Sequence, residues 1–348
     1  MDSLNYSFSK FFQSEETIKK MYEQAFNKNS DNLKITLLDG GMKCAVYLIT
    51  NGDEKVVLKI APKDQNMLLT FERNTMWWEV QILRLLENLN IPIPQILYYD
   101  DSRKNCKSPY FFMSYIEGKK LSDYKGLLDD KSLLSIEYDL GKICQQLSKI
   151  EGNKYFICSY SDIKFSNNYE FIKNLFESLI LDAKIKNIII PNYNYEDFIS
   201  ILDNNKVQLN NVKRICLVHS DIWDGNIIIK DGKISGVVDF ADLYFCDELF
   251  NFYFHTLQSE TSKSFVNGFG KEKLSSDEEI RIIIYRIFTI LKMIIEKDYK
   301  KFDNKNTDFS WLYNKLEKEM KKLDEYNIGQ TRGIIKWKII YLAQENLL

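Results

Sequence analysis

Short apolar runs separated by turn residues mark the first part of the chain. Three of them, at residues 33–38, 45–50 and 55–60, have the length of β-strands. Gly40-Gly41 separates the first two runs, and Asn51-Gly52 between the second and third is a typical hairpin turn. This pattern predicts a β-rich region near the N-terminus.

Apolar residues then change to a spacing of three and four, which predicts a helix over residues 70–89. The segment Ile91-Pro-Ile-Pro94 ends this helix, because proline cannot continue the hydrogen-bond ladder. Two further strands are predicted at residues 95–99 and 110–115. Up to this point the chain is expected to be mostly strand.

Beyond Gly118 the helical spacing dominates. One amphipathic helix is predicted over residues 133–150, and Ser275 to Glu279 reads as a capping box that opens a long helix. A compact β segment interrupts the helices, with strands predicted at 215–219, 227–230 and 234–238. We therefore predict an α+β fold with two lobes: a small β-rich N-lobe, residues 1–116, and a larger helical C-lobe, residues 117–348.

Composition limits the classes of function. The 348 residues are 45% hydrophobic and 28% charged, and the net charge is −2 without a basic stripe, so no nucleic-acid partner is expected. Arg281, Arg286 and Lys292 interrupt the most apolar stretch, residues 280–295, which predicts a buried helix and no membrane span. The N-terminus shows no secretory signal, and the six scattered cysteines suit free buried thiols. We expect a cytoplasmic protein, monomeric or dimeric.

The segment His219-Ser-Asp-Ile-Trp-Asp-Gly-Asn226, followed by Val238-Asp239, carries the strongest chemical signal. Strand pairing could bring Asn226 and Asp239 to one edge, where two oxygen-bearing side chains suit Mg²⁺ shared with substrate phosphates. Asp221 would stand apart from the metal, able to orient a hydroxyl group and accept its proton. Alone, an Asp and Asn at this spacing are common in loops; the long combination is what favours chemistry.

This pattern resembles the aminoglycoside phosphotransferase and choline kinase superfamily, distant relatives of the protein kinases, from about residue 33 to about residue 260. The resemblance implies transfer of the γ-phosphate of ATP or GTP to a hydroxyl group of a small molecule, on a protein-kinase-like fold. It makes Asp221 the catalytic base and His219 the support of its loop, with Asn226 and Asp239 as ligands of Mg²⁺. A protein kinase is disfavoured, because the chain has Asp-Phe-Ala for Asp-Phe-Gly and no Ala-Pro-Glu.

The same resemblance assigns nucleotide-binding residues in the N-lobe. Lys59, at the end of a predicted strand, corresponds to the lysine that binds phosphates, and Glu79 in the following helix to the glutamate that holds it. Gly40 and Gly41 resemble the family's phosphate-positioning turn. The backbone of Ser114 and Ile116 resembles the hinge that binds an adenine edge. Departures from the family pattern include Ser220 and Asn251, where the family has glycine and an acid.

The acceptor stays open between an aminoglycoside, as in a resistance enzyme, and a fructosamine, choline or homoserine, as in a metabolic kinase. A catalytically silent, kinase-shaped binding or spore-coat protein is the alternative from another class. Acidic residues that could bind a polycationic sugar are Asp242, Asp247, Glu248, Glu260 and Asp277 to Glu279, although the last group equally suits a helix N-terminus. Aromatic residues that could stack on a sugar, but better suit a core, are Tyr244, Phe245, Phe250, Phe252 and Tyr253.

Overall fold

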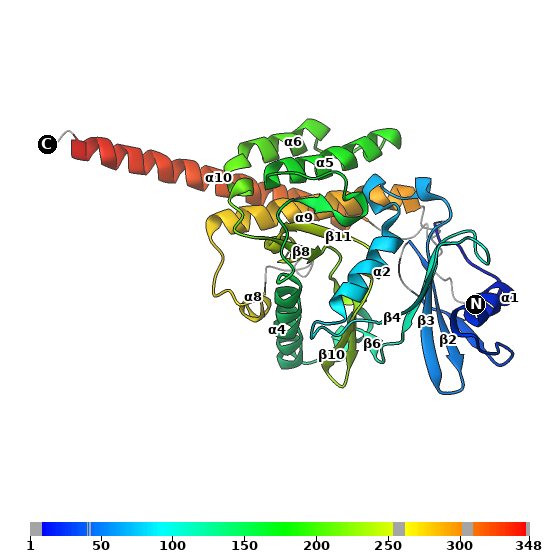
Figure 1. Cartoon of the computed structure of the whole chain (residues 1–348). Helices are drawn as coiled ribbons and strands as arrows, with labels where there is room; N and C mark the ends of the chain where they lie inside the picture. Colours follow the sequence, from blue (N-terminus) through cyan, green and yellow to red (C-terminus); the bar gives the residue numbers. More distant parts are fainter. Residues whose placement is uncertain (1–8, 40, 42, 253–261, 301–308, 346–348) are drawn as a thin grey trace.

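The computed structural model of the chain describes residues 9–39, 41, 43–252, 262–300 and 309–345, with no side-chain description at 300 and 329–345. It has two lobes, a sheet-based N-lobe and a helical C-lobe (Figure 1). The predicted α+β fold with two lobes is confirmed. Gly40, Tyr253 and Glu260 from the sequence predictions lie outside the described residues.

An antiparallel five-stranded sheet in the order β1-β2-β3-β5-β4 forms the N-lobe. Its strands are β1 (Lys34–Leu37), β2 (Ala45–Asn51), β3 (Glu54–Ile60), β4 (Ile96–Asp100) and β5 (Tyr110–Ser114). Side chains alternate between its faces: Leu58 and Phe112 pack against α1 (Glu15–Phe26), whereas Phe111 packs against α2 (Thr75–Leu86). Each predicted strand of this lobe is confirmed to within one or two residues.

The helix predicted over residues 70–89 is shorter than expected. Thr70–Glu72 forms a separate 3₁₀ turn, and α2 begins only at Thr75. Asp182 of the C-lobe accepts hydrogen bonds from the backbone N–H and the hydroxyl group of Thr70, both at 2.8 Å. Asn74 then has a left-handed backbone, φ 55°, which interrupts any continuous helix. A contact between lobes thus overrides the local helical spacing.

The chain leaves the N-lobe sheet after Ser114 and joins a second sheet. There β6 (Lys119–Lys120) pairs with β9 (Ile227–Lys230), which pairs with β10 (Lys233–Val237). Gly118 permits this junction, because a Cβ atom there would lie 2.5 Å from the carbonyl oxygen of Ile229. A lobe boundary between residues 116 and 117 is our proposal, based on this change of sheet.

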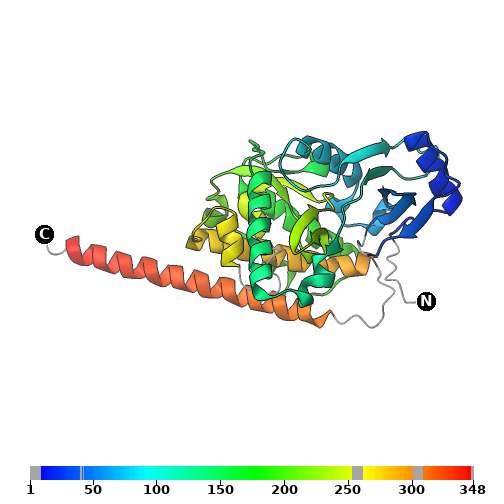
Figure 2. The same cartoon turned by 90° about the horizontal axis from the view of Figure 1, so that it is seen from below.

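Helices form most of the C-lobe. They are α3 (Leu121–Tyr124), α4 (Asp130–Leu147), α5 (Asn168–Ile185), α6 (Tyr195–Asn204), α7 (Lys206–Asn210), α8 (Lys263–Gly268), α9 (Ser276–Lys300) and α10 (Ser310–Glu345). A third sheet, β7-β11-β8, consists of β7 (Phe156–Ile157), β8 (Ile215–His219) and β11 (Leu243–Asp247). The first turns of α10 pack against α9, and the helix then extends away from the C-lobe (Figure 2).

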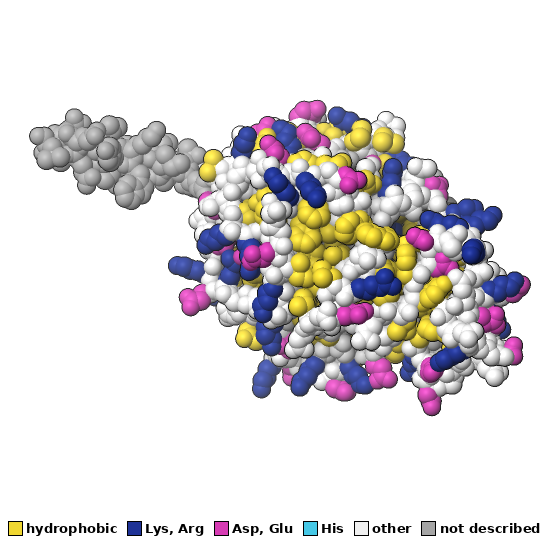
Figure 3. Space-filling view, viewed as in Figure 1, with side chains coloured by type: hydrophobic (Ala, Val, Ile, Leu, Met, Phe, Trp, Pro, Cys, Tyr) yellow, Lys and Arg dark blue, Asp and Glu magenta, His cyan; other side chains and the backbone are white. Residues whose placement is uncertain are grey.

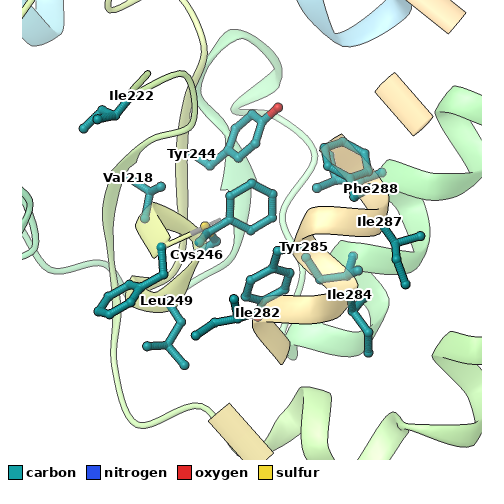
Figure 4. Close-up of a cluster of buried hydrophobic side chains, with 14 of the residues drawn as sticks. Val218, Ile222, Tyr244, Cys246, Leu249, Ile282, Ile284, Tyr285, Ile287 and Phe288 are labelled. Atoms are coloured by element: carbon teal, nitrogen blue, oxygen red, sulfur yellow. The ribbon is translucent and has the colours of Figure 1, made fainter. Parts of the chain in front are cut away.

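The C-lobe core lies between α9 and the β8/β11 strands. Side chains from both elements meet there, among them Val218, Tyr244, Tyr285 and Phe288 (Figure 4). The buried charges of α9 are paired: Arg281 lies 2.7 Å from Asp247, for example. The prediction of a buried, charge-interrupted helix is confirmed. Within the described part of the chain, none of the helices combines the length and apolar character needed to cross a membrane.

Other local predictions are also confirmed. The capping box of α9 is reciprocal: Ser275 Oγ accepts from the Glu278 N–H at 3.3 Å, and Glu278 Oε2 accepts from the Ser275 N–H at 2.8 Å. All six cysteines are buried free thiols. Tyr244, Phe250 and Phe252 are core residues, as expected. On the face shown in Figure 3, basic and acidic side chains are interspersed around a band of hydrophobic ones.

Candidate active site

The loop after β8 and the turn after β10 lie beside each other at the junction of the lobes. Asn226 connects them, because its carbonyl oxygen accepts from the Val238 N–H at 3.0 Å. Its side-chain Nδ2 donates to the backbone oxygen of Asp221 and to Asp221 Oδ2, both at 2.9 Å. Asp221, Asn226 and the Val238-Asp239 turn are thereby brought together, as the sequence predicted.

The shape of the Asp221 loop depends on a close approach inside it. The indole ring of Trp223 folds over Gly225, and a Cβ atom at Gly225 would lie 2.3 Å from that ring. Any larger residue would displace the tryptophan or the turn. Asp224, which precedes the glycine, points elsewhere and forms a 2.8 Å ion pair with Lys125. The glycine therefore sets the conformation that brings Asn226 back towards Asp221.

His219 is buried beneath the loop and serves as a neutral support. Its Nδ1 accepts from the Asp221 N–H at 3.2 Å, so Nε2 carries the proton and donates to the Val238 carbonyl at 3.2 Å. Burial lowers the pKa of His219 to about 4, although the bond to Val238 opposes the shift. The imidazole therefore joins both halves of the site without a charge near neutral pH.

Asp239 stands at the turn after β10 in an unusual backbone conformation. Its φ of 65° lies in the left-handed region, which residues other than glycine adopt infrequently. Its Oδ1 atom lies 2.6 Å from Lys59 Nζ. Lys59 in turn donates to both carboxylate oxygens of Glu79, at 2.7 and 2.9 Å. We call Lys59, Glu79 and Asp239 the lysine-centred cluster.

Charges in this cluster are set by their mutual contacts. Burial alone would lower the pKa of Lys59, but Asp239 and Glu79 outweigh it and hold the pKa well above its ordinary value. Burial would likewise raise the pKa of Asp239, yet the ammonium group of Lys59 produces a net lowering. Lys59 is therefore protonated and Asp239 ionised at neutral pH.

The donor set near Asp239 fits a metal ion that takes few protein ligands. An ionised carboxylate and the amide of Asn226 are hard oxygen donors of the kind that Mg²⁺ prefers. Among the described residues no group of three or more His, Cys, Asp or Glu side chains could hold a metal. The site thus suits Mg²⁺ that keeps oxygens from water or substrate and does not suit a closed protein cage.

A second charge cluster at the lobe junction was not predicted from the sequence. Asp242 forms two ion pairs. Its Oδ2 atom lies 2.7 Å from Nζ of Lys292 in α9, and its Oδ1 atom lies 3.3 Å from Nζ of Lys43 in the β1–β2 connection. Glu72 lies 3.9 Å from Lys292. We call Asp242, Lys43, Lys292 and Glu72 the aspartate-centred cluster. Only their tertiary placement brings these residues together; no local motif marks them.

Of the remaining predicted nucleotide-binding residues, the structure describes Gly41, Ser114 and Ile116. Gly41 has φ 64°, a conformation that glycine adopts readily, and forms part of the β1–β2 connection. The Ser114 N–H donates to the Gln95 carbonyl at 2.9 Å, so this hydrogen is used within the lobe. Ile116 packs its side chain where a Cβ atom of Gly236 would be, 2.4 Å away. The hinge thus rests on the β9–β10 hairpin.

Most acids considered for a cationic acceptor lie far from Asp221. Asp247 pairs with Ile215 at the opposite end of β8 from His219. Glu248, next to it, accepts from Arg214 at 2.5 Å. The Asp277 to Glu279 group begins α9. Lys292 follows Glu278 by 14 positions, which amounts to about 20 Å along the helix. Asp242 is near the site, but it already binds two lysines.

Comparisons with known proteins identify the family of the chain. The model of the phosphotransferase enzyme family matches residues 34–279, which is most of the chain. No curated protein matches the chain.

Several solved structures share the fold. Aminoglycoside phosphotransferase APH(2'')-Ib, ADP-bound, is 18% identical with a TM-score of 0.57, over 90% of this chain and 99% of that one. A putative fructosamine-3-kinase from Haemophilus somnus 129PT is 17% identical with a TM-score of 0.63, over 87% and 97%. A thermostable mutant of aminoglycoside phosphotransferase APH(4)-Ia, in a ternary complex with AMP-PNP and hygromycin B, is 14% identical with a TM-score of 0.61, over 88% and 98%. The chain therefore belongs to the phosphotransferase enzyme family, as a kinase of small molecules.

Proposed function

We propose that the chain transfers the γ-phosphate of ATP or GTP to a hydroxyl group of a small molecule, with Mg²⁺ as cofactor. The observation that carries this proposal is the convergence of Asp221, Asn226, Asp239 and Lys59 at the lobe junction. A silent binding protein would have no physical need for the full set. ADP and AMP-PNP in the structures named above support a nucleotide donor.

In this proposal each side chain has a separate task. Asp221 orients the acceptor hydroxyl and accepts its proton as the oxygen attacks the γ-phosphorus and the bond to the β-phosphate oxygen breaks. Lys59, held by Glu79, binds donor phosphates, and Asn226 and Asp239 would hold the metal. A bound Mg²⁺ would offset the charge of the phosphate oxygens. His219 acts by positioning, because its two nitrogens are used by Asp221 and Val238.

Two acceptor classes follow from the comparisons. The family makes an aminoglycoside the first candidate acceptor, because structurally similar phosphotransferases are complexed with gentamicin and with hygromycin B. A sugar amine or amino alcohol, such as a fructosamine or choline, is favoured by one observation on this chain. Among the described residues, each acid considered for a polycation is paired with basic groups or remote from Asp221. An acceptor with few positive charges fits that arrangement better.

A release assay for ADP and GDP tests the proposal. It combines Mg²⁺, either nucleotide and a panel of aminoglycosides, fructosamines, choline and homoserine. Asp221→Ala is expected to reduce acceptor-dependent release by about 10²–10⁴-fold while nucleotide binding stays within about twofold. Asp224→Ala is the matched control, because that acid is in the same loop but faces Lys125. Full activity of the Asp221 variant would refute the assigned base, and absence of nucleotide binding in the wild type would refute the function.

A further inference from the structure

We propose that Lys43 binds the γ-phosphate of the nucleoside triphosphate, as a second phosphate-binding lysine besides Lys59. The inference rests on the proposed function and deepens it, because it assigns a role to a residue outside the motifs that indicated the activity. Lys43 follows the glycine turn of the N-lobe and precedes β2 by two residues. Val46 of that strand pairs directly with Lys59, so both lysines lie at the same end of the sheet.

The contacts of Lys43 are those of a side chain held loosely. Its Nζ atom lies 3.3 Å from Asp242 Oδ1 and 3.3 Å from Thr75 Oγ1. Bonds between an ammonium group and a carboxylate are usually about 2.7–2.9 Å. Lys292 holds the other oxygen of the same carboxylate at 2.7 Å. Asp242 would therefore keep a close cationic partner if Lys43 moved to a phosphate.

Charge near Asp239 also points to Lys43. Burial would lower its pKa, but Asp242, Glu72 and Asp239 raise it above the ordinary value, so the group is a permanent cation. His219 is neutral there, and Lys59 already serves Glu79. The transferred phosphoryl group accumulates charge on its outer oxygens and requires a cation close to it. Among the described residues, Lys43, which follows the glycine turn, could supply this cation.

Lys43 is not fully enclosed by its neighbours, since 12% of its side chain is exposed. It lines a cavity of about 220 Å³ together with Glu72, Thr75 and Glu79. A lysine enclosed by close packing could not exchange partners without moving its neighbours.

The test compares nucleotides that differ by the γ-phosphate. We would measure dissociation constants for ADP and for the β,γ-imido analogue of ATP, and for the corresponding GTP pair, all with Mg²⁺. Lys43→Met is expected to weaken binding of the triphosphate analogue about tenfold or more and that of the diphosphate less than about threefold. Lys43→Arg should restore most of the difference. Lys63→Met, an exposed lysine on the rim of the same cavity, is the control.

A structural role would give another result. If Lys43 acts only by tethering Asp242, Lys43→Met would weaken both nucleotides equally, or the effect would vanish in an Asp242→Asn background. Either finding, or unchanged binding of both nucleotides, would overturn the inference. Normal diphosphate binding with selective loss of the triphosphate in both backgrounds would establish it. A wild-type chain that binds neither nucleotide would instead reject the proposed function itself, so the two failures are distinguishable.

Discussion

Two buried charge clusters join the lobes, and they are built in opposite ways. In the lysine-centred cluster one ammonium group serves two carboxylates, which leaves a surplus negative charge. In the aspartate-centred cluster one carboxylate serves two lysines, and Glu72 at 3.9 Å from Lys292 balances the four charges. The first is therefore suited to receive a cation, whereas the second is neutral before any ligand binds. Clusters of the same residue types thus support different chemistry, because they differ in the sign of the central group and in net charge.

Removal of the central charge from each cluster should give the largest difference in folding stability between the two clusters. Lys59→Met leaves Glu79 buried without its cation and is expected to destabilise the fold by about 3–5 kcal/mol. Asp242→Asn should cost less, about 2 kcal/mol, because Lys292 keeps Glu72 at 3.9 Å and the asparagine oxygen can still accept from a lysine. Urea denaturation measures both. Lys55→Met, an exposed lysine on the same strand as Lys59, is the control, and equal costs for all three would contradict the comparison.

Acidification should affect the neutral group between the clusters. The pKa of His219 is about 4 in the folded chain, below its ordinary value of 6.5, because burial disfavours the charged ring. The unfolded chain therefore binds more protons between these values, and stability falls as pH decreases from about 6.5 to 4. The loss amounts to about 3 kcal/mol at most and is absent above that range.

The pH effect is measured as the difference between wild type and His219→Asn in unfolding free energy against pH. His255→Asn serves as the control, since it removes the other histidine of the chain. If both variants lose the same acid sensitivity, His219 is not the responsible group.

The smallest expected change is in the stability of Lys43→Met. Removal of the Lys43 ammonium group leaves Asp242 paired with Lys292 at 2.7 Å, so no buried charge loses its only partner. We therefore expect a loss of only about 1 kcal/mol, the net contribution of one hydrogen bond. Thermal unfolding checks this value. A loss as large as that of Lys59→Met would show that Lys43 is a structural tether, and the two clusters would no longer differ in the way described.

The two clusters also show what the sequence could and could not predict. Lys59 and Glu79 were predicted as partners, and Asp239 as a metal ligand, because each occupies a position in a recognisable motif; the contact of Asp239 with Lys59 was not predicted. Asp242 and Lys292 are 50 residues apart, and nothing local links a helix lysine to that aspartate. The late start of α2 was missed for the same reason, since Asp182 of the C-lobe binds Thr70. Strand limits such as Ile215–His219 were predicted well because apolar runs and hairpin turns are local signals.

The six buried thiols can report when the structure around them opens. A thiol reagent reacts with an enclosed cysteine only during moments when the surrounding structure separates. Cys44 lies beside Lys43 at the lobe junction, whereas Cys144 and Cys246 lie in the C-lobe core. The labelling rate at Cys44 would therefore measure separation of the lobes, and the rates at Cys144 and Cys246 would measure unfolding of the core. No engineered cysteine is needed. The natural chain already carries the sensors for both events.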